Sequence, residues 1–152
     1  LLIDWLLVDW LLVDWLLVDW LLEIETFEHL EVWKVCRELR KDLSILIKRF
    51  PAEEKFRLVD QILRASRSVT NNIAEGFGRY HFQENIQFCR QSRGSLYELI
   101  DQLSIACDEG YVDESEFTAY RLRILDALKL LNGYILPLRT RKSASKNQQI
   151  NK

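Results

Sequence analysis

The stretch LVDQILRASRSVTNNIAEGFGR, residues 58–79, decides the fold because its apolar and small residues recur along one face of a helix. Three- and four-residue steps separate most members of this stripe, which are Leu58, Val59, Ile62, Ser66, Val69 and Ile73. Gly76 and Gly78 then mark the place where the helix stops. Before the stretch, Pro51 followed by Glu53 and Glu54 suits a first helical turn. The pattern predicts a helix from about residue 51 to the two glycines.

Three more segments show the same helical spacing. In residues 27–50 either Val32 or Trp33 faces inward, Phe50-Pro51 ends the helix, and the rest of the stripe is Phe27, Leu30, Cys36, Leu39, Leu43, Leu46 and Ile47. Residues 82–107 carry an inner stripe of Phe82, Ile86, Cys89, Leu96, Leu99, Ile100, Leu103 and Ala106. Residues 113–137 carry one of Phe117, Tyr120, Ile124, Leu125, Leu128, Leu131 and Ile135.

The link between the last two segments contains two helix-end signals. Gly110 stands where a C-cap is expected, and Asp113 with Glu116 forms a capping box. Pro137 is expected to end the last helix. Four amphipathic helices with short links predict an all-α fold, an up-down antiparallel four-helix bundle over residues 23–138.

Residues 1–22 repeat the pentapeptide LLVDW, with Ile in place of Val in the first copy. A period of five matches neither a helix nor a strand. An Asp in every copy opposes a membrane span, since each costs about 2.5–3.5 kcal/mol near the bilayer centre. We interpret the segment as low complexity, arising from a short tandem repeat in the coding DNA. An anchoring or interfacial helix and a partner-binding segment are the alternatives.

Residue types that commonly serve in catalysis or metal binding, such as cysteine and histidine, are few and lie far apart in the sequence. The three cysteines are far apart and match no metal-ligand spacing, and without a secretion signal they indicate reduced thiols in the cytoplasm. The two histidines, His29 and His81, have no Cys or carboxylate at ligand spacing. No phosphate-binding loop or nucleophile elbow is present. We therefore expect a cytoplasmic protein that is not an enzyme and holds no metal or cofactor.

The charge of the chain is unevenly spread. Residues 1–26 contain four Asp, two Glu and no base, a charge of −6, so the remaining residues carry +4 of the net −2. Residues 139–152 are predicted to be a basic disordered tail, with Arg139, Arg141, Lys142, Lys146 and Lys152. This balance permits contact with nucleic acid without requiring it.

Five arginines are the candidate nucleic-acid-binding residues: Arg64, Arg67, Arg79, Arg90 and Arg93. Two lie on the second helix, two share a face of the third, and one lies between the helices. If these helices are neighbours, the five form a basic band matched to phosphates. Glu84, Glu98 and Asp101 would neutralise part of it, and solvated or intersubunit pairing is the alternative.

Asn72 and Glu75 belong to an unusual polar cluster near the end of the second helix. Asn71 and Glu75 are four residues apart, as are Glu75 and Arg79, so their side chains are neighbours on the helix surface. We interpret the cluster as a structural network that orients the helix end, and a ligand or RNA contact is the alternative.

The motifs QILRASRSV (61–69) and NIAEGFGR (72–79) resemble the four-helix bundle proteins encoded in bacterial 23S ribosomal RNA intervening sequences. Supporting matches are LEVW (30–33), Phe50-Pro51 with Glu54, RGSLYEL (93–99) and GYV (110–112). The resemblance covers about residues 26–139 and leaves the pentapeptide repeat outside.

The resemblance implies an assembly and a class of partner. Relatives are encoded within insertions excised from ribosomal RNA, and their fold is similar to the accessory protein of diversity-generating retroelements. That protein forms a homopentameric ring and binds nucleic acid and a reverse transcriptase. We therefore expect a non-enzymatic homo-oligomer, a pentameric ring by this resemblance, that binds structured RNA or DNA, or a ribonucleoprotein. A protein–protein adaptor ring without nucleic-acid contact is the alternative, and membrane attachment is not expected.

Overall fold

The computed structural model describes residues 24–79 and 81–150, and within these ranges the chain forms helices and no strand. Four α-helices follow one another: α2 (Glu31–Leu46), α3 (Leu58–Phe77), α4 (Phe82–Asp108) and α5 (Glu114–Ile150). Three short 3-10 turns accompany them: η1 (Phe27–His29), η2 (Ile47–Arg49) and η3 (Ala52–Glu54). The pentapeptide repeat lies outside the described residues.

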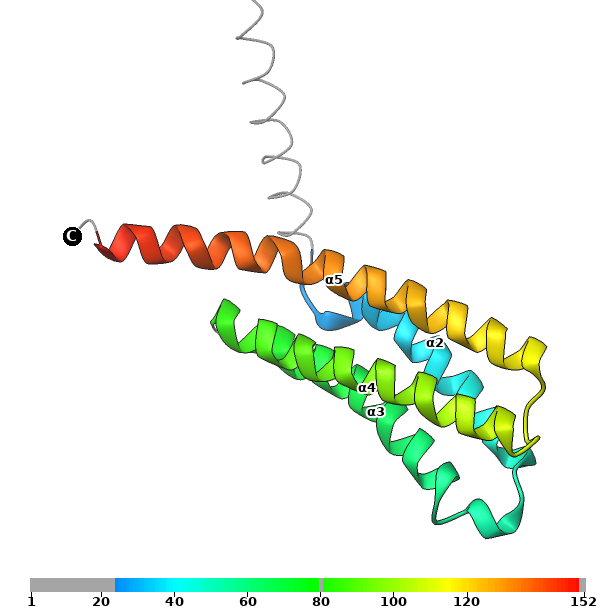
Figure 1. The fold of residues 1–152 in the computed structure, drawn as a ribbon. Coiled ribbons are helices and arrows are strands. Elements are labelled where there is room, and N and C mark those ends of the chain that lie inside the picture. The colour runs from blue at the N-terminus through cyan, green and yellow to red at the C-terminus, as the bar shows by residue number, and fades with distance from the viewer. Residues whose placement is uncertain (1–23, 80, 151–152) are drawn as a thin grey trace, which may run out of the picture.

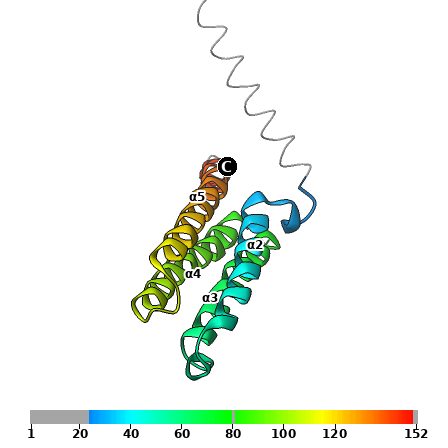
Figure 2. The ribbon, with the colours of Figure 1, turned by 90° about the vertical axis from the view of Figure 1, so that its right-hand side faces the viewer.

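The four helices run alongside one another as a bundle (Figures 1 and 2). Each helix packs against its neighbour in the chain, and α2 also contacts α5. Figure 1 shows the C-terminal part of α5 continuing past the N-terminal end of α4. The predicted all-α four-helix bundle is therefore confirmed.

The core consists of the stripes that the spacing predicts. The largest fully buried side chains include Leu43, Ile62, Leu99 and Leu131, which come from the four different helices. Val32 is buried whereas Trp33 is only half-buried, so Val32 is the inward residue of that pair. Phe82 is 38% exposed and does not belong to the core, because it is the first residue of α4 and lies at the rim of the bundle.

The start of α3 differs from the prediction. Only the short turn η3 follows Pro51, and the α-helix begins at Leu58. Phe56 is 85% exposed, whereas Leu58 is 4% exposed, so the helix begins where the chain first contributes to the core. Glu54 Oε2 accepts a hydrogen bond from the backbone N–H of Leu58 at 3.2 Å and so satisfies one free donor of the first turn.

The connection between α4 and α5 has the predicted end signals. Gly110 adopts a φ of +74°, and the N–H of Tyr111 bonds to the carbonyl of Ala106 at 2.8 Å, as in a Schellman motif. The capping box is formed: Glu116 N donates to Asp113 Oδ1 at 2.8 Å, and Asp113 N donates to Glu116 Oε2 at 3.3 Å. These signals are local, which is why the sequence alone locates them.

The end of α5 differs from the end that the sequence predicts. The sequence predicts that this helix stops at Pro137 and that residues 139–152 form a disordered tail, whereas Pro137 lies inside a helix that continues to Ile150. Proline removes one backbone hydrogen bond from the helix. Ile135 and Leu138 on either side of Pro137 are buried in the core at 2% and 6% exposure, and their packing holds this part of α5 against the bundle.

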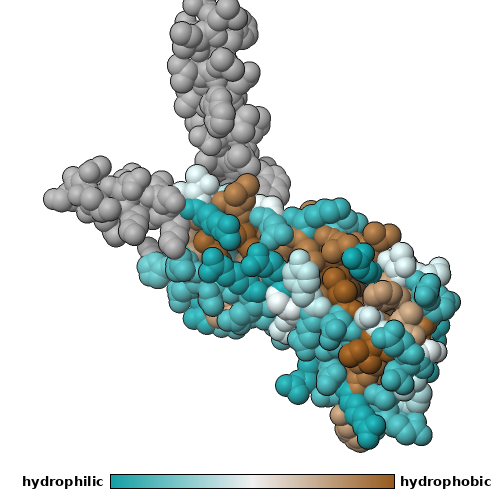
Figure 3. Space-filling model, viewed as in Figure 1, coloured by the Kyte–Doolittle hydropathy of each residue, from teal (hydrophilic) through white to brown (hydrophobic). Residues whose placement is uncertain are grey.

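The face of the bundle seen in Figure 3 is mostly hydrophilic, with hydrophobic side chains gathered between α4 and α5 on the side of their connection. No helix within the described ranges combines the length and the hydropathy needed to span a membrane.

Candidate nucleic-acid interface

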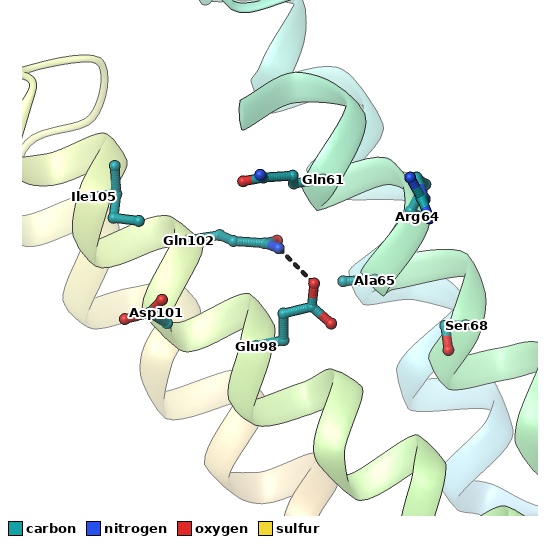
Figure 4. A pocket seen from close by; sticks show the side chains of 8 residues that line it. All are labelled: Gln61, Arg64, Ala65, Ser68, Glu98, Asp101, Gln102 and Ile105. Atoms are coloured by element: carbon teal, nitrogen blue, oxygen red, sulfur yellow. Dashed lines mark hydrogen bonds between the residues drawn. The ribbon is translucent and has the colours of Figure 1, made fainter. Parts of the chain in front are cut away.

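A groove of about 520 Å³ runs between α3 and α4, on the side of the bundle that carries the sequence motifs. Residues of α3 line one wall and residues of α4 line the other, and Gln61 and Gln102 extend toward each other from the two walls (Figure 4). The groove forms because α3 and α4 pack along each other with small side chains at the contact. Ala65 and Ser68 on α3 are two of these.

Serine side chains join the two walls, and an asparagine of α3 bonds to one of these serines. Ser95 Oγ on α4 donates to Ser68 Oγ on α3 at 2.9 Å, and Asn72 Nδ2 donates to Ser68 Oγ at 3.0 Å and to its backbone carbonyl at 2.8 Å. Farther into the bundle, Ser92 Oγ donates to the backbone carbonyl of Val69 at 3.0 Å. These bonds fix the register of α4 against α3.

The α4 wall of the groove is rich in hydrogen-bond acceptors. Gln102 Nε2 donates to Glu98 Oε1 at 2.9 Å, and Asp101 provides a second carboxylate beside them. The buried Gln102 Oε1 has no hydrogen-bond partner among the described residues. Because acceptors and carboxylates repel phosphate, the α4 wall is not a phosphate site.

The structure does not bring the five candidate arginines onto one face. Arg64 lines the groove, is 79% exposed and lies 3.7 Å from Asp60. Arg67 is exposed one turn farther along α3. Within the described residues, no carboxylate lies within salt-bridge distance of Arg67, Arg90 or Arg93.

Arg90 and Arg93 lie on the side of α4 away from α3. Ser92 and Ser95 face α3, as their hydrogen bonds show. Each arginine precedes one of these serines by two residues, which is a rotation of about 200° around the helix. The basic band predicted from the sequence is therefore divided into an α3 group and an α4 group.

The predicted polar cluster consists of two separate parts. Asn72 bonds to Ser68, as described above, and Glu75 forms an ion pair with Arg79. The guanidinium of Arg79 also lies 4.9 Å from the centre of the Phe88 ring on α4, a cation–π contact. The contact of Arg79 with Phe88 joins the end of α3 to α4, whereas both Asn72 bonds stay within α3.

Asn85 is a site residue that the sequence does not single out. It is buried on α4, donates from Nδ2 to the hydroxyl of Tyr134 on α5 at 2.9 Å, and accepts from Cys89 Sγ at 3.4 Å. A lone Asn in an amphipathic pattern resembles a surface residue, and only its spacing from Ile86 and Cys89 indicates burial.

The described part of the chain offers little for covalent or metal chemistry. Burial raises the pKa of the Cys36 and Cys89 thiols to about 12, so both are protonated and poor nucleophiles at neutral pH. Within residues 24–79 and 81–140, no group of three or more His, Cys, Asp or Glu side chains could hold a metal ion.

Comparison with known proteins gives the family. Residues 28–133 match the family described as 23S rRNA-intervening sequence protein. The chain belongs to this family. The matched residues include the groove and all five arginines, and they leave the pentapeptide repeat outside.

A solved structure shares the fold. It is described as a protein with unknown function from the S23 ribosomal protein family of Bacteroides thetaiotaomicron. The TM-score is 0.63 at 22% identity, over 68% of this chain and 97% of that one. Proteins of curated function give no significant match. At this identity the likeness establishes the fold alone.

Proposed function

We propose that the chain is a non-enzymatic, cytoplasmic, homo-oligomeric bundle that binds structured nucleic acid, and that Arg64 and Arg67 on α3 make the first phosphate contacts. The observation that carries this proposal is the presence of exposed arginines on α3 without full neutralisation by neighbouring carboxylates. The family description, which refers to ribosomal RNA insertions, supports the choice of RNA.

The geometry supports a division of roles around the groove. Arginine reads phosphate through its planar fork of donors, and contacts of this kind position a protein without specifying sequence. Asn72 and the Glu75–Arg79 pair hold the end of α3 in place, so they act on the shape of the surface. Arg90 and Arg93 would contact a nucleic acid only if it also reached the other side of α4.

Fluorescence anisotropy of labelled structured RNA, duplex DNA and a single strand, titrated with the full chain at several salt concentrations, tests the proposal. We expect log K to fall linearly with log salt. Arg64→Glu/Arg67→Glu should weaken binding at least tenfold and reduce the salt slope by about 1.4–1.8, since each phosphate contact contributes about 0.7–0.9.

The matched control is Lys34→Glu/Lys41→Glu, which makes the same charge change on α2, where both lysines are exposed and already pair with glutamates. Equal losses in the two double variants would mean that only net charge matters, and they would remove the α3 arginines from the interface. Absence of binding at low salt would refute nucleic-acid binding altogether.

A protein adaptor is the second candidate, because large apolar side chains are exposed. Phe56 is 85% exposed, Leu136 65% and Ile45 64%. An adaptor would bind a partner polypeptide through such side chains, and its binding would survive moderate salt. Binding lost on Phe56→Ala or Leu136→Ala and unaffected by 0.5 M salt would favour this function over the first.

A further inference from the structure

The groove between α3 and α4 contains a buried amide that the fold leaves partly unsatisfied. Gln102 is only 4% exposed, and its Oε1 accepts no hydrogen bond from the described residues. The side chain points across the groove toward the α3 wall, from which Gln61 extends to meet it (Figure 4). Because a buried acceptor without a donor destabilises a fold, its presence here indicates a place for a donor from outside the protomer.

Two carboxylates stand beside this amide on the α4 wall. Glu98 Oε1 accepts from Gln102 Nε2 at 2.9 Å, whereas no described residue donates to Glu98 Oε2. Asp101 lines the groove three residues farther along α4. Within the described residues, neither Glu98 nor Asp101 forms an ion pair. The α4 wall therefore offers its acceptors to a ligand that is positively charged and donates hydrogen bonds.

We propose that the groove binds a short linear diamine, an alkyl chain with a primary ammonium group at each end. An ammonium has three donors and no acceptor, and here the donors meet Gln102 Oε1, Glu98 Oε2 and the amide oxygen of Gln61. The terminal torsion of a glutamine is soft, so a small rotation of the Gln102 amide turns its Oε1 toward the ligand. The second ammonium lies against the carboxylate of Asp101.

The groove suits the alkyl chain of such a ligand as well as its charged ends. Ala65 on α3 and Ile105 on α4 give the lining apolar surface, and Ile105 is 41% exposed. Cβ atoms three residues apart on a helix are about 5–6 Å from each other, so Glu98 and Asp101 hold the two ammonium groups a few carbon atoms apart. The volume of about 520 Å³ is in the usual range of small-molecule sites.

Other classes of ligand fit the groove less well. Phosphate would meet two carboxylates that repel it, and a neutral ligand would leave both without a counter-charge. Among the residues that the structure describes, no group of three or more His, Cys, Asp or Glu side chains could hold a metal ion. Arg64 on the α3 wall opposes a cation only weakly, because it is 79% exposed and lies 3.7 Å from Asp60. This site is independent of the proposed function, since it needs neither nucleic acid nor assembly.

Isothermal titration calorimetry of the full chain with 1,4-diaminobutane, in the absence of nucleic acid, tests the site. The comparison ligands are 1-aminobutane, which lacks the second ammonium, and 1,4-butanediol, which has hydroxyls in place of both. The monoamine should bind about threefold to fivefold more weakly than the diamine, the effect of an exposed ion pair. The diol should show no measurable binding, since it brings no charge to the carboxylates. A diamine that does not bind, or a diol that binds equally well, would overturn the proposal.

A pair of matched variants separates the site from general charge attraction. Glu98→Gln keeps an acceptor for Gln102 Nε2 and removes the charge, so it should weaken diamine binding about tenfold. The control is Glu84→Gln, which makes the same change at an exposed position of α4 outside the groove. Glu84 is about 21 Å from Glu98 along the helix, beyond the Debye length, so this variant should bind the diamine within about twofold of the original chain. Equal losses in the two variants would overturn the site.

Gln102→Leu separates a role in ligand binding from a role in the fold. This variant removes the unpartnered acceptor, so without ligand it should be at least as stable in urea as the original chain, and yet it should bind the diamine about tenfold more weakly. Thermal unfolding gives a second readout: excess 1,4-diaminobutane should raise the Tm of the original chain and of Glu84→Gln, and should change that of Gln102→Leu and Glu98→Gln much less. An equal rise in all four proteins would place the ligand outside the groove and overturn the proposal.

Discussion

Gly76 on α3 lies close against α4, and Gly76→Ala tests whether that close approach sets the helix packing. An added Cβ would lie 2.9 Å from Asn85 Oδ1, 3.0 Å from Phe88 Cβ and 3.2 Å from the backbone carbonyl of Asn85. The side chain of Asn85, which provides the nearest atom, cannot move away freely. Asn85 is buried and hydrogen-bonded to Tyr134 and Cys89, so its displacement also disturbs the contact between α4 and α5.

The expected magnitude is the difference between two opposing effects. Alanine is favoured over glycine inside a helix by about 1 kcal/mol, and by less in the last turn, where Gly76 lies. Overpacking of a tight contact costs about 1–3 kcal/mol. The net expectation is a loss of about 1 kcal/mol of unfolding free energy, equivalent to about 3–4 °C in Tm for a chain of this size.

Gly94→Ala is the matched control, because Gly94 is also helical but has open space in front of it. This variant should gain about 0.5–1 kcal/mol, so the two substitutions should shift stability in opposite directions. Urea unfolding followed by circular dichroism, at concentrations where the chain is monomeric, measures both. If Gly76→Ala is as stable as Gly94→Ala, the close approach of α3 and α4 at Gly76 does not constrain the fold.

Three further predictions concern the helix cap, a buried hydrogen bond and alkaline pH. Asp113→Ala removes the cap of α5 and should cost about 1 kcal/mol in urea unfolding, whereas Glu114→Ala, one residue later, should cost less than half of that; equal costs would argue against the capping box. Tyr134→Phe deletes the 2.9 Å bond from Asn85 and should cost about 1 kcal/mol, and a double-mutant cycle with Asn85→Ala should show a coupling of similar size; a coupling near zero would mean that the bond contributes nothing. The buried thiols of Cys36 and Cys89 have their pKa raised from 9.0 to about 12, so they bind protons more tightly in the folded chain. Their contribution to stability is complete below pH 9 and is lost as pH rises from 9 to 12, by about 1.4 kcal/mol per pH unit and thiol. Urea unfolding at pH 8, 9.5 and 10.5 should therefore show a steeper decline than in Cys36→Ala/Cys89→Ala, and parallel declines would contradict the assignment.

Much of the candidate site was accessible from the sequence, because it depends on local spacing. The Glu75–Arg79 pair follows from a four-residue separation on one helix. No spacing along the chain predicts the bond between Ser68 and Ser95 or the bond between Ser92 and Val69, since each joins residues on different helices. The close approach of Asn85 to Gly76 also depends on the packing of α4 against α3.

The sequence by itself determined four amphipathic helices, their inner stripes, the glycine stops and the capping box at Asp113, because apolar periodicity and end signals act within a few residues along the chain. The tertiary structure decided the helix ends at the two places where they differ from those predicted by the local signals. It moved the start of α3 to Leu58 and carried α5 past Pro137, since burial of neighbouring side chains outweighs the preference of a single proline. It also decided which arginines share a face. Spacing gives the direction of a side chain around its own helix, and only the packing of α3 against α4 shows that Arg90 and Arg93 lie on the opposite side from Arg64.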